Sequence, residues 1–99
     1  MYARLTLMNL GPGTRNTADA LVERFKPALA EREGVKSVIF IADDEAGKYG
    51  SFVLWETKEA AEAASEAIFP KLNEAISGLV NEAPQQPLFE VIDIVEPGM

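Results

Sequence analysis

The feature that most constrains the fold is the order of the predicted elements, which runs strand, helix, strand, strand, helix, strand. Four segments are rich in β-branched and aromatic residues and are bounded by turn residues, a composition typical of strands. Two other segments repeat apolar residues at the i, i+3, i+4, i+7 spacing of an amphipathic helix. The predicted strands are 1–10, 35–42, 49–56 and 88–95.

Polar residues mark where the two predicted helices begin. Asn16 is the expected N-cap of the first helix, and Thr57 is the expected N-cap of the second, which is predicted over 58–80. Pro27 and Pro70 lie inside these segments. Because proline lacks an N–H group and crowds the preceding turn, we expect a kink in the first helix and a bend or break in the second.

This order of elements is that of the split βαβ, or ferredoxin-like, arrangement. It predicts an α+β fold, βαββαβ, with a four-stranded antiparallel sheet and both helices on one face. A chain of 99 residues without a linker or repeat is the size of one domain, so we assign residues 1–99 to a single unit.

The strands are apolar on both faces, although a sheet covered by helices on one side should be polar on the other. In the strand 35–42, for example, Ile39 and Ile41 point to one face and Val38 and Phe40 point to the other. An exposed apolar patch of this size marks an interface. We therefore expect a homodimer in which two sheets pack face to face, burying about 1,600 Å² or more. The alternatives are a shifted strand register or a tail that covers the open face.

Composition excludes several classes of function. The chain contains no histidine and no cysteine, so it lacks the usual proton shuttle of neutral pH, the thiolate nucleophile and the preferred zinc ligands. A net charge of -7 argues against binding nucleic acid or an anionic membrane surface. No apolar run reaches the roughly 20 residues of a membrane span, and no signal peptide is evident, so we expect a cytoplasmic protein.

The segment 49–61, with the sequence YGSFVLWETKEAA, resembles the strand-to-helix junction of antibiotic biosynthesis monooxygenase-like proteins, which belong to the dimeric α+β barrel superfamily. In that family an aromatic-rich strand ends in Trp-Glu, and a polar cap precedes an alanine-rich helix. The resemblance implies a ligand cleft between the helices and the sheet. It also implies an activity like that of the cofactor-free oxygenases of polycyclic phenols or of the haem-degrading enzymes.

The sequence departs from this family at Ala64, where many relatives carry histidine and haem-degrading ones carry tryptophan. The haem-degrading relatives also use a later histidine on the same helix, and this chain has none. The resemblance therefore implies neither haem nor another cofactor, and we expect no metal site. Ala64 lies in an alanine-rich stretch that permits either a ligand cleft or close packing of the helix on the sheet.

Aromatic and cationic side chains in the strands are the candidate ligand-binding residues. Tyr49 and Trp55 share one face of their strand and would stack on a planar ligand or donate hydrogen bonds to it. The alternative is that both residues only pack the sheet. Arg4 would hold a carboxylate or phenolate, or else would pair with Glu90 or Asp93 on the neighbouring strand.

The last strand and the first turn supply three further candidates. Glu90 and Asp93 face opposite sides of the last strand, and one of them, if buried, would have a raised pKa and act as a general base. The alternative is that these charges only discourage pairing of the edge strand with another chain. Asn9 would orient a ligand carbonyl, or would serve the adjacent turn.

These observations predict a dimeric protein that binds a small molecule and resembles cofactor-independent monooxygenases of aromatic or phenolic substrates. A non-catalytic, ligand-sensing or regulatory module of the same fold is the alternative, because fold alone does not decide function.

Overall fold

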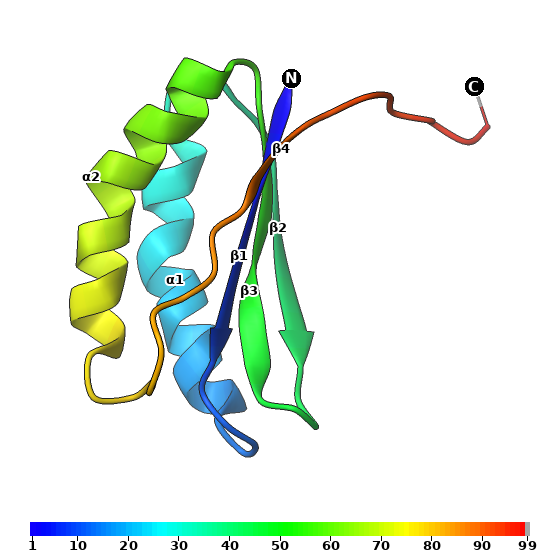
Figure 1. Ribbon diagram of the computed structural model, residues 1–99. Coiled ribbons are helices and arrows are strands. Elements are labelled where there is room, and N and C mark those ends of the chain that lie inside the picture. The colour runs from blue at the N-terminus through cyan, green and yellow to red at the C-terminus, as the bar shows by residue number, and fades with distance from the viewer. Residues whose placement is uncertain (99) are drawn as a thin grey trace.

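One antiparallel sheet of four strands, in the order β2-β3-β1-β4, forms the centre of the protein (Figure 1). The computed structural model describes residues 1–98. The central strands β1 and β3 pair along their whole lengths, and β2 and β4 flank them. The strands are β1 (Tyr2–Asn9), β2 (Val35–Asp43), β3 (Lys48–Trp55) and β4 (Leu88–Glu90).

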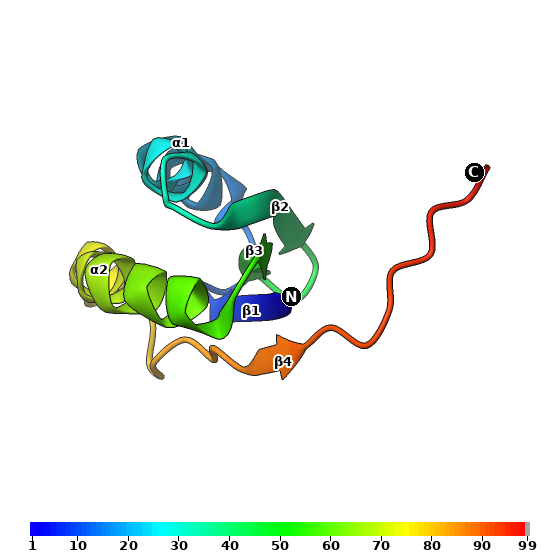
Figure 2. The same cartoon turned by 90° about the horizontal axis from the view of Figure 1, so that it is seen from above.

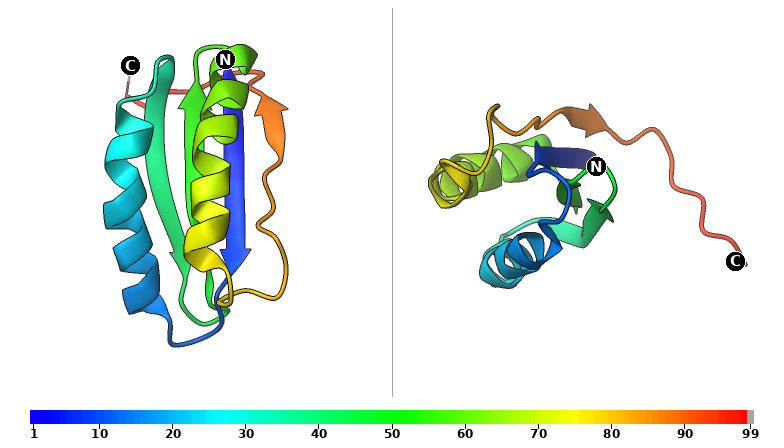
Figure 3. Two further views of the ribbon diagram at one scale, coloured as in Figure 1. Left: turned by 90° about the vertical axis from the view of Figure 1, so that its left-hand side faces the viewer. Right: turned by 90° about the horizontal axis from the view of Figure 1, so that it is seen from below.

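Both helices, α1 (Arg15–Ala30) and α2 (Lys58–Ile76), lie on the same face of the sheet (Figure 3). The chain therefore has the ferredoxin-like βαββαβ arrangement that the order of elements predicted. Thr57 caps α2 as expected, because its hydroxyl oxygen accepts the N–H of Ala60 at 3.0 Å. Within residues 1–98, no helix is both long enough and apolar enough to cross a membrane.

The register of the central strands decides which side chains face the helices. Tyr2 lies opposite Trp55, and Arg4 lies opposite Val53. Because successive side chains alternate between faces, Arg4, Val53 and Trp55 share the face that the helices cover. Ala3, opposite Leu54, lies on the outer face.

A small apolar core joins the sheet to α2. Val53 and Trp55 are each 2% exposed, and they pack against Ala61 and Ala64. The short alanine side chains let the helix approach the indole closely. Burial of one large apolar side chain contributes roughly 1.5–3 kcal/mol, so Trp55 accounts for a sizeable share of the stability of a domain this small.

The predicted helix boundaries were wrong at two ends. The N-cap of α1 is Thr14 rather than Asn16, and the Thr14 hydroxyl donates to the carbonyl oxygen of Gly11 at 2.7 Å. The second helix ends at Ile76 rather than near residue 80, because Gly78 takes up a φ of 84° and stops it. Pro70 does not break α2, which is continuous from Lys58 to Ile76.

The last strand is shorter than the predicted 88–95 and ends at Glu90. Its antiparallel partner is the start of β1, where Tyr2 lies opposite Glu90, and the N–H of Val91 donates to the Met1 carbonyl oxygen at 2.9 Å. Beyond that point β1 offers no further residue for pairing. The segment after Val91 therefore leaves the sheet on the side away from the helices (Figure 2).

The outer face of the sheet is apolar and open to solvent in a single chain. Ile39 is 49% exposed and Phe89 is 52% exposed. The tail does not cover this face, since Ile92 is itself 98% exposed. Apolar side chains thus line both faces of the sheet, as the strand sequences indicated.

The sheet is tightest at Gly50, in the middle of β3. A Cβ added there would overlap the carbonyl oxygen of Thr6 on the neighbouring strand. We expect Gly50→Ala to lower the free energy of unfolding by roughly 1–3 kcal/mol, because the backbones of two central strands must move apart. Urea denaturation checks this. Ser51→Ala is the control, since it adds no atoms at the next position, and equal stability of Gly50→Ala and wild type would contradict the structural reason.

Candidate functional site

A cavity of about 160 Å³ lies between α1, α2 and the helix-facing side of the sheet, and it is partly open to solvent. Helix side chains such as Phe25, Leu29, Ile68 and Leu72 form much of its wall. A dry apolar cavity of about 150 Å³ accepts a ligand the size of benzene, so the enclosed part here suits about one aromatic ring. Its floor is made by Arg4, Thr6 and Met8 of β1 and by Tyr49, Ser51, Val53 and Trp55 of β3.

Arg4 brings a charge into this apolar space. Its side chain is half-buried, and its Nη1 atom donates to the backbone carbonyl oxygen of Gln86 at 2.6 Å. Among residues 1–98, no carboxylate forms an ion pair with it, so the alternative pairing with Glu90 or Asp93 is wrong. Burial lowers the pKa of the guanidinium, and Glu62 opposes that shift. The group stays charged, because arginine does not lose its proton in proteins.

Trp55 is a second donor in the cavity wall. The indole Nε1 atom is buried and has no hydrogen-bond partner among residues 1–98. A buried donor without an acceptor costs about 1–3 kcal/mol. Trp55 both packs the core, against Ala61 and Ala64, and lines the cavity. Trp55 therefore packs the core and lines the cavity at the same time, and so does Ala64.

The loop before β4 closes one side of the cavity. The Ser65 hydroxyl on α2 donates to the Gln86 side-chain oxygen at 3.1 Å. Gln86 thus accepts from Ser65 with its side chain and from Arg4 with its backbone. No sequence pattern indicates this role, because Gln86 lies in an irregular loop and belongs to no motif.

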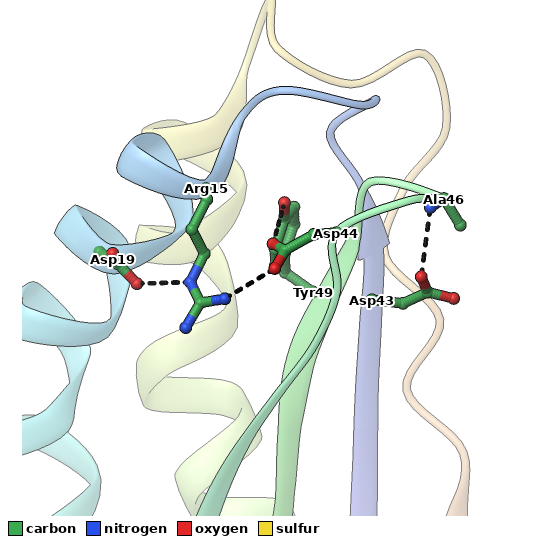
Figure 4. Close-up of polar contacts among 6 residues, drawn as sticks. All are labelled: Arg15, Asp19, Asp43, Asp44, Ala46 and Tyr49. Atoms are coloured by element: carbon green, nitrogen blue, oxygen red, sulfur yellow. Dashed lines mark hydrogen bonds and ion pairs between the residues drawn. The ribbon is translucent and has the colours of Figure 1, made fainter.

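A polar cluster lies where α1 begins, at another part of the cavity wall (Figure 4). The Tyr49 phenol donates to one oxygen of Asp44 at 3.0 Å, and Arg15 binds the other oxygen at 3.0 Å. Arg15 also binds Asp19 at 2.9 Å. These contacts tie the β2–β3 hairpin to the start of α1. The Arg15–Asp44 contact joins segments 29 residues apart, so no local pattern in the sequence indicates it.

The electrostatics of this cluster keep the Tyr49 phenol protonated. Tyr49 is 4% exposed. Burial first, and then the hydrogen bond to Asp44, raise the pKa of the phenol above its ordinary value of 10.0. The phenol is thus a hydrogen-bond donor at neutral pH, and its hydrogen is donated to Asp44.

Three predicted site residues lie away from the cavity. Asn9 is exposed, and its side-chain oxygen accepts the N–H of Gly11 at 3.1 Å, which is turn chemistry. Glu90 is exposed and accepts the Tyr2 hydroxyl at 3.2 Å. The Asp93 carboxylate accepts the N–H of Ile94 at 2.8 Å. In a single chain neither carboxylate reaches the space where Arg4 and Trp55 lie.

Known proteins resemble this chain in fold rather than in sequence. No protein-family model matches the chain, and no curated protein matches it. A Streptomyces coelicolor monooxygenase from the gene ActVA-Orf6, solved with nanaomycin D, has a TM-score of 0.77 at 17% identity, covering 98% of this chain and 92% of that chain. SnoaB, a cofactor-independent oxygenase from Streptomyces nogalater, has a TM-score of 0.75 at 14% identity, covering 95% of each chain.

MhuD, solved with manganese protoporphyrin IX, has a TM-score of 0.71 at 15% identity and covers 97% of this chain and 99% of that chain. The similar structures also include an antibiotic biosynthesis monooxygenase at a TM-score of 0.76. Such identities establish the fold alone. This chain has the fold of antibiotic biosynthesis monooxygenase structures, and the resemblance at the strand-to-helix junction is confirmed at that level.

Because MhuD was solved with a porphyrin, we ask whether the residues of this cavity could hold haem. Haem iron is held by histidine, cysteine, tyrosine, or methionine beside histidine. The chain has no histidine or cysteine, and the Tyr49 phenol is occupied by Asp44. Met8 lines the cavity without a histidine to accompany it. This donor set does not fit haem.

The Asp44–Tyr49 contact gives a testable titration. The chain has two tyrosines, so Tyr2→Phe leaves Tyr49 as the only phenol. In that background we expect Asp44→Asn to lower the pKa of Tyr49, because the negative charge that favours the protonated phenol is lost. Ultraviolet absorbance titration measures it.

Asp43→Asn is the matched control, because the Asp43 carboxylate accepts the N–H of Ala46 at 3.2 Å and not the phenol. It should shift the Tyr49 pKa far less. Equal shifts from the two substitutions would show that the hydrogen bond to Asp44 does not hold the phenol proton.

Proposed function

We propose that the chain binds a small planar ring compound between its helices and sheet, and oxygenates it without a cofactor. The observation that carries this proposal is the partly open, largely apolar cavity of ring size, whose lining residues include the half-buried cation Arg4 and the aromatic residue Trp55. Ligand sites are mostly apolar, with a few polar groups that fix orientation. The similar fold of SnoaB, a cofactor-independent oxygenase, supports the type of reaction.

In such a reaction the substrate supplies the electrons. In an anthrone a ring CH₂ group becomes C=O; in a dihydroxynaphthalene a ring C–H carbon becomes C=O while the phenol on the same ring becomes the second carbonyl of a quinone. In both cases two hydrogens leave the substrate, and O₂ provides the new carbonyl oxygen and the oxygen of one water molecule. The substrate must first lose a proton to reach an electron-rich anion. The contribution of the protein is to orient the ring, exclude water and place hydrogen-bond donors where the negative oxygen develops. Arg4 is the residue proposed for that last role, and Trp55 is proposed to help orient the ring.

Oxygen uptake tests this function directly. Purified protein with anthrones and dihydroxynaphthalenes should consume O₂ faster than buffer does, with no metal or flavin added. A second candidate, a ligand sensor, is favoured by one observation: the carboxylates proposed as bases, Glu90 and Asp93, lie outside the cavity. Thermal shift without oxygen consumption would favour the sensor, because a ligand that binds only the native state raises its melting temperature.

Ala64 allows the site to be blocked. Ala64→Trp should fill the cavity and abolish ring binding and any oxygen uptake. Because Ala64 also packs against Trp55 in the core, the larger side chain should lower the free energy of unfolding by roughly 1–3 kcal/mol, the cost typical of an overpacked core. Ala63→Trp is the matched control, because Ala63 is exposed on the same helix. Calorimetric titration and urea denaturation of both variants measure the effects, and undiminished binding by Ala64→Trp would place the site elsewhere.

We also propose that two chains pair through the outer face of the sheet to form a homodimer. The exposed apolar side chains of this face, with Ile39 at 49% and Phe89 at 52%, support the pairing. The tail adds Ile92 and Val95, which are 98% and 81% exposed. A patch of this kind on an isolated chain is the mark of an association surface. The helices and the cavity lie on the opposite face, so pairing leaves them free (Figure 3).

A charge placed in that face should separate the pair. We expect wild type to have the mass of a dimer at micromolar concentration and Ile39→Glu to have the mass of a monomer, because a carboxylate would be buried without a partner. Light scattering after size exclusion measures both. Leu79→Glu is the control, since Leu79 is equally exposed, at 50%, but lies outside the sheet. A monomeric wild type would refute the pairing.

A further inference from the structure

Two hydroxyl groups lie side by side on the floor of the cavity. Thr6 of β1 is directly opposite Ser51 of β3 in the register, and both residues line the cavity. A sheet position that faces covering helices is usually apolar, because a polar side chain placed there loses contact with water. Two neighbouring hydroxyls on this face therefore require partners.

Neither hydroxyl is used inside the protein. Threonine and serine that lie opposite each other in a sheet can hydrogen-bond to each other. Within residues 1–98, however, neither Thr6 nor Ser51 makes a side-chain hydrogen bond. The fully buried side-chain atoms without a partner in this part of the chain are Arg4 Nε, Arg32 Nε and Trp55 Nε1. The two hydroxyl oxygens are not among them, and both side chains are half-buried, so the oxygens are accessible from the cavity.

The polar side chains that the helices contribute to the cavity wall already have protein partners. Arg15 of α1 is held by Asp19 and Asp44. The Ser65 hydroxyl of α2 donates to the Gln86 side chain. The rest of the helix wall is apolar. A ligand in the cavity therefore meets free hydroxyls on the sheet side and hydrocarbon on the helix side.

The spacing of the two hydroxyls suits two oxygens on one edge of a ring. Residues directly opposite each other in an antiparallel pair have Cβ atoms about 5 Å apart. Each hydroxyl can both donate and accept a hydrogen bond, so Thr6 and Ser51 together can bind two neighbouring hydroxyl or carbonyl oxygens. An oxygen on the opposite edge of the ring would face helix side chains such as Leu29 and Ile68, which offer it no partner.

We propose that Thr6 and Ser51 are specificity-determining residues, which bind oxygen substituents gathered on one edge of a ring, as in a catechol. This inference rests on the proposed ring-binding site and specifies its ligand class: neutral rings that carry oxygens on one edge and hydrocarbon on the other. Rings with the same oxygens on opposite edges satisfy the hydroxyl pair only in part and leave an oxygen against the helices. They therefore bind more weakly.

Two isomers of one compound test this pattern in the wild-type protein. The hydroxyls of 2,3-dihydroxynaphthalene lie on one edge, and those of 2,6-dihydroxynaphthalene lie on opposite edges of a molecule of the same size. Isothermal titration calorimetry under nitrogen measures binding without oxygen consumption. The 2,3 isomer should bind roughly fivefold to fiftyfold more tightly, the range expected when one hydrogen bond is lost and a hydroxyl is left unpaired.

Variants of the hydroxyl pair locate the effect. Thr6→Val and Ser51→Ala each remove one hydroxyl with little change in the size of the side chain. Each should reduce the preference for the 2,3 isomer, and the double variant should bind the two isomers equally. Thr17→Val is the matched control, because Thr17 is a half-buried threonine of α1 that does not line the cavity. It should leave the preference unchanged.

The outcomes separate this inference from the proposed function. Equal binding of the two isomers by wild type, or a preference that survives removal of both hydroxyls, would overturn the role of Thr6 and Ser51 while leaving the cavity as a ring-binding site. Failure of both isomers to bind would refute the cavity as a ring site and this inference with it. The isomer comparison needs only wild type and no turnover, so it decides the inference even if a variant fails to fold.

Discussion

The antiparallel register between β1 and β3 is the constraint on which the rest of the structure depends. It places Arg4 beside Val53 and Tyr2 beside Trp55, so that one face of the central strands receives Arg4, Tyr49 and Trp55. A shift of one residue in β3 would turn Tyr49 and Trp55 to the outer face while Arg4 stayed on the helix-facing side, because strand side chains alternate with a period of two. The core around Trp55 and the cavity floor would then be lost together.

The element order, the antiparallel sheet and the placement of the helices could be predicted from the sequence, because hydrophobic periodicity and turn residues are local signals. The end of β4 could not. Residues after Val91 have a strand composition, but strand formation needs a partner, and β1 has no residue left to offer beyond Met1. The predicted helix ends were wrong for a related reason. The ends lie at Thr14 and near Gly78 because of backbone conformation, which the spacing of apolar residues does not indicate.

The candidate site was predictable where alternation along a strand decides direction. Arg4, Tyr49, Trp55 and Ala64 all line the cavity, since each lies on a face that the pattern identifies. The contribution of Gln86 depends on the course of an irregular loop, for which the sequence has no periodic signal. The alternative that Arg4 pairs with Glu90 or Asp93 was wrong for two reasons. Asp93 lies beyond Glu90, where β4 ends, and the Glu90 carboxylate accepts the Tyr2 hydroxyl instead.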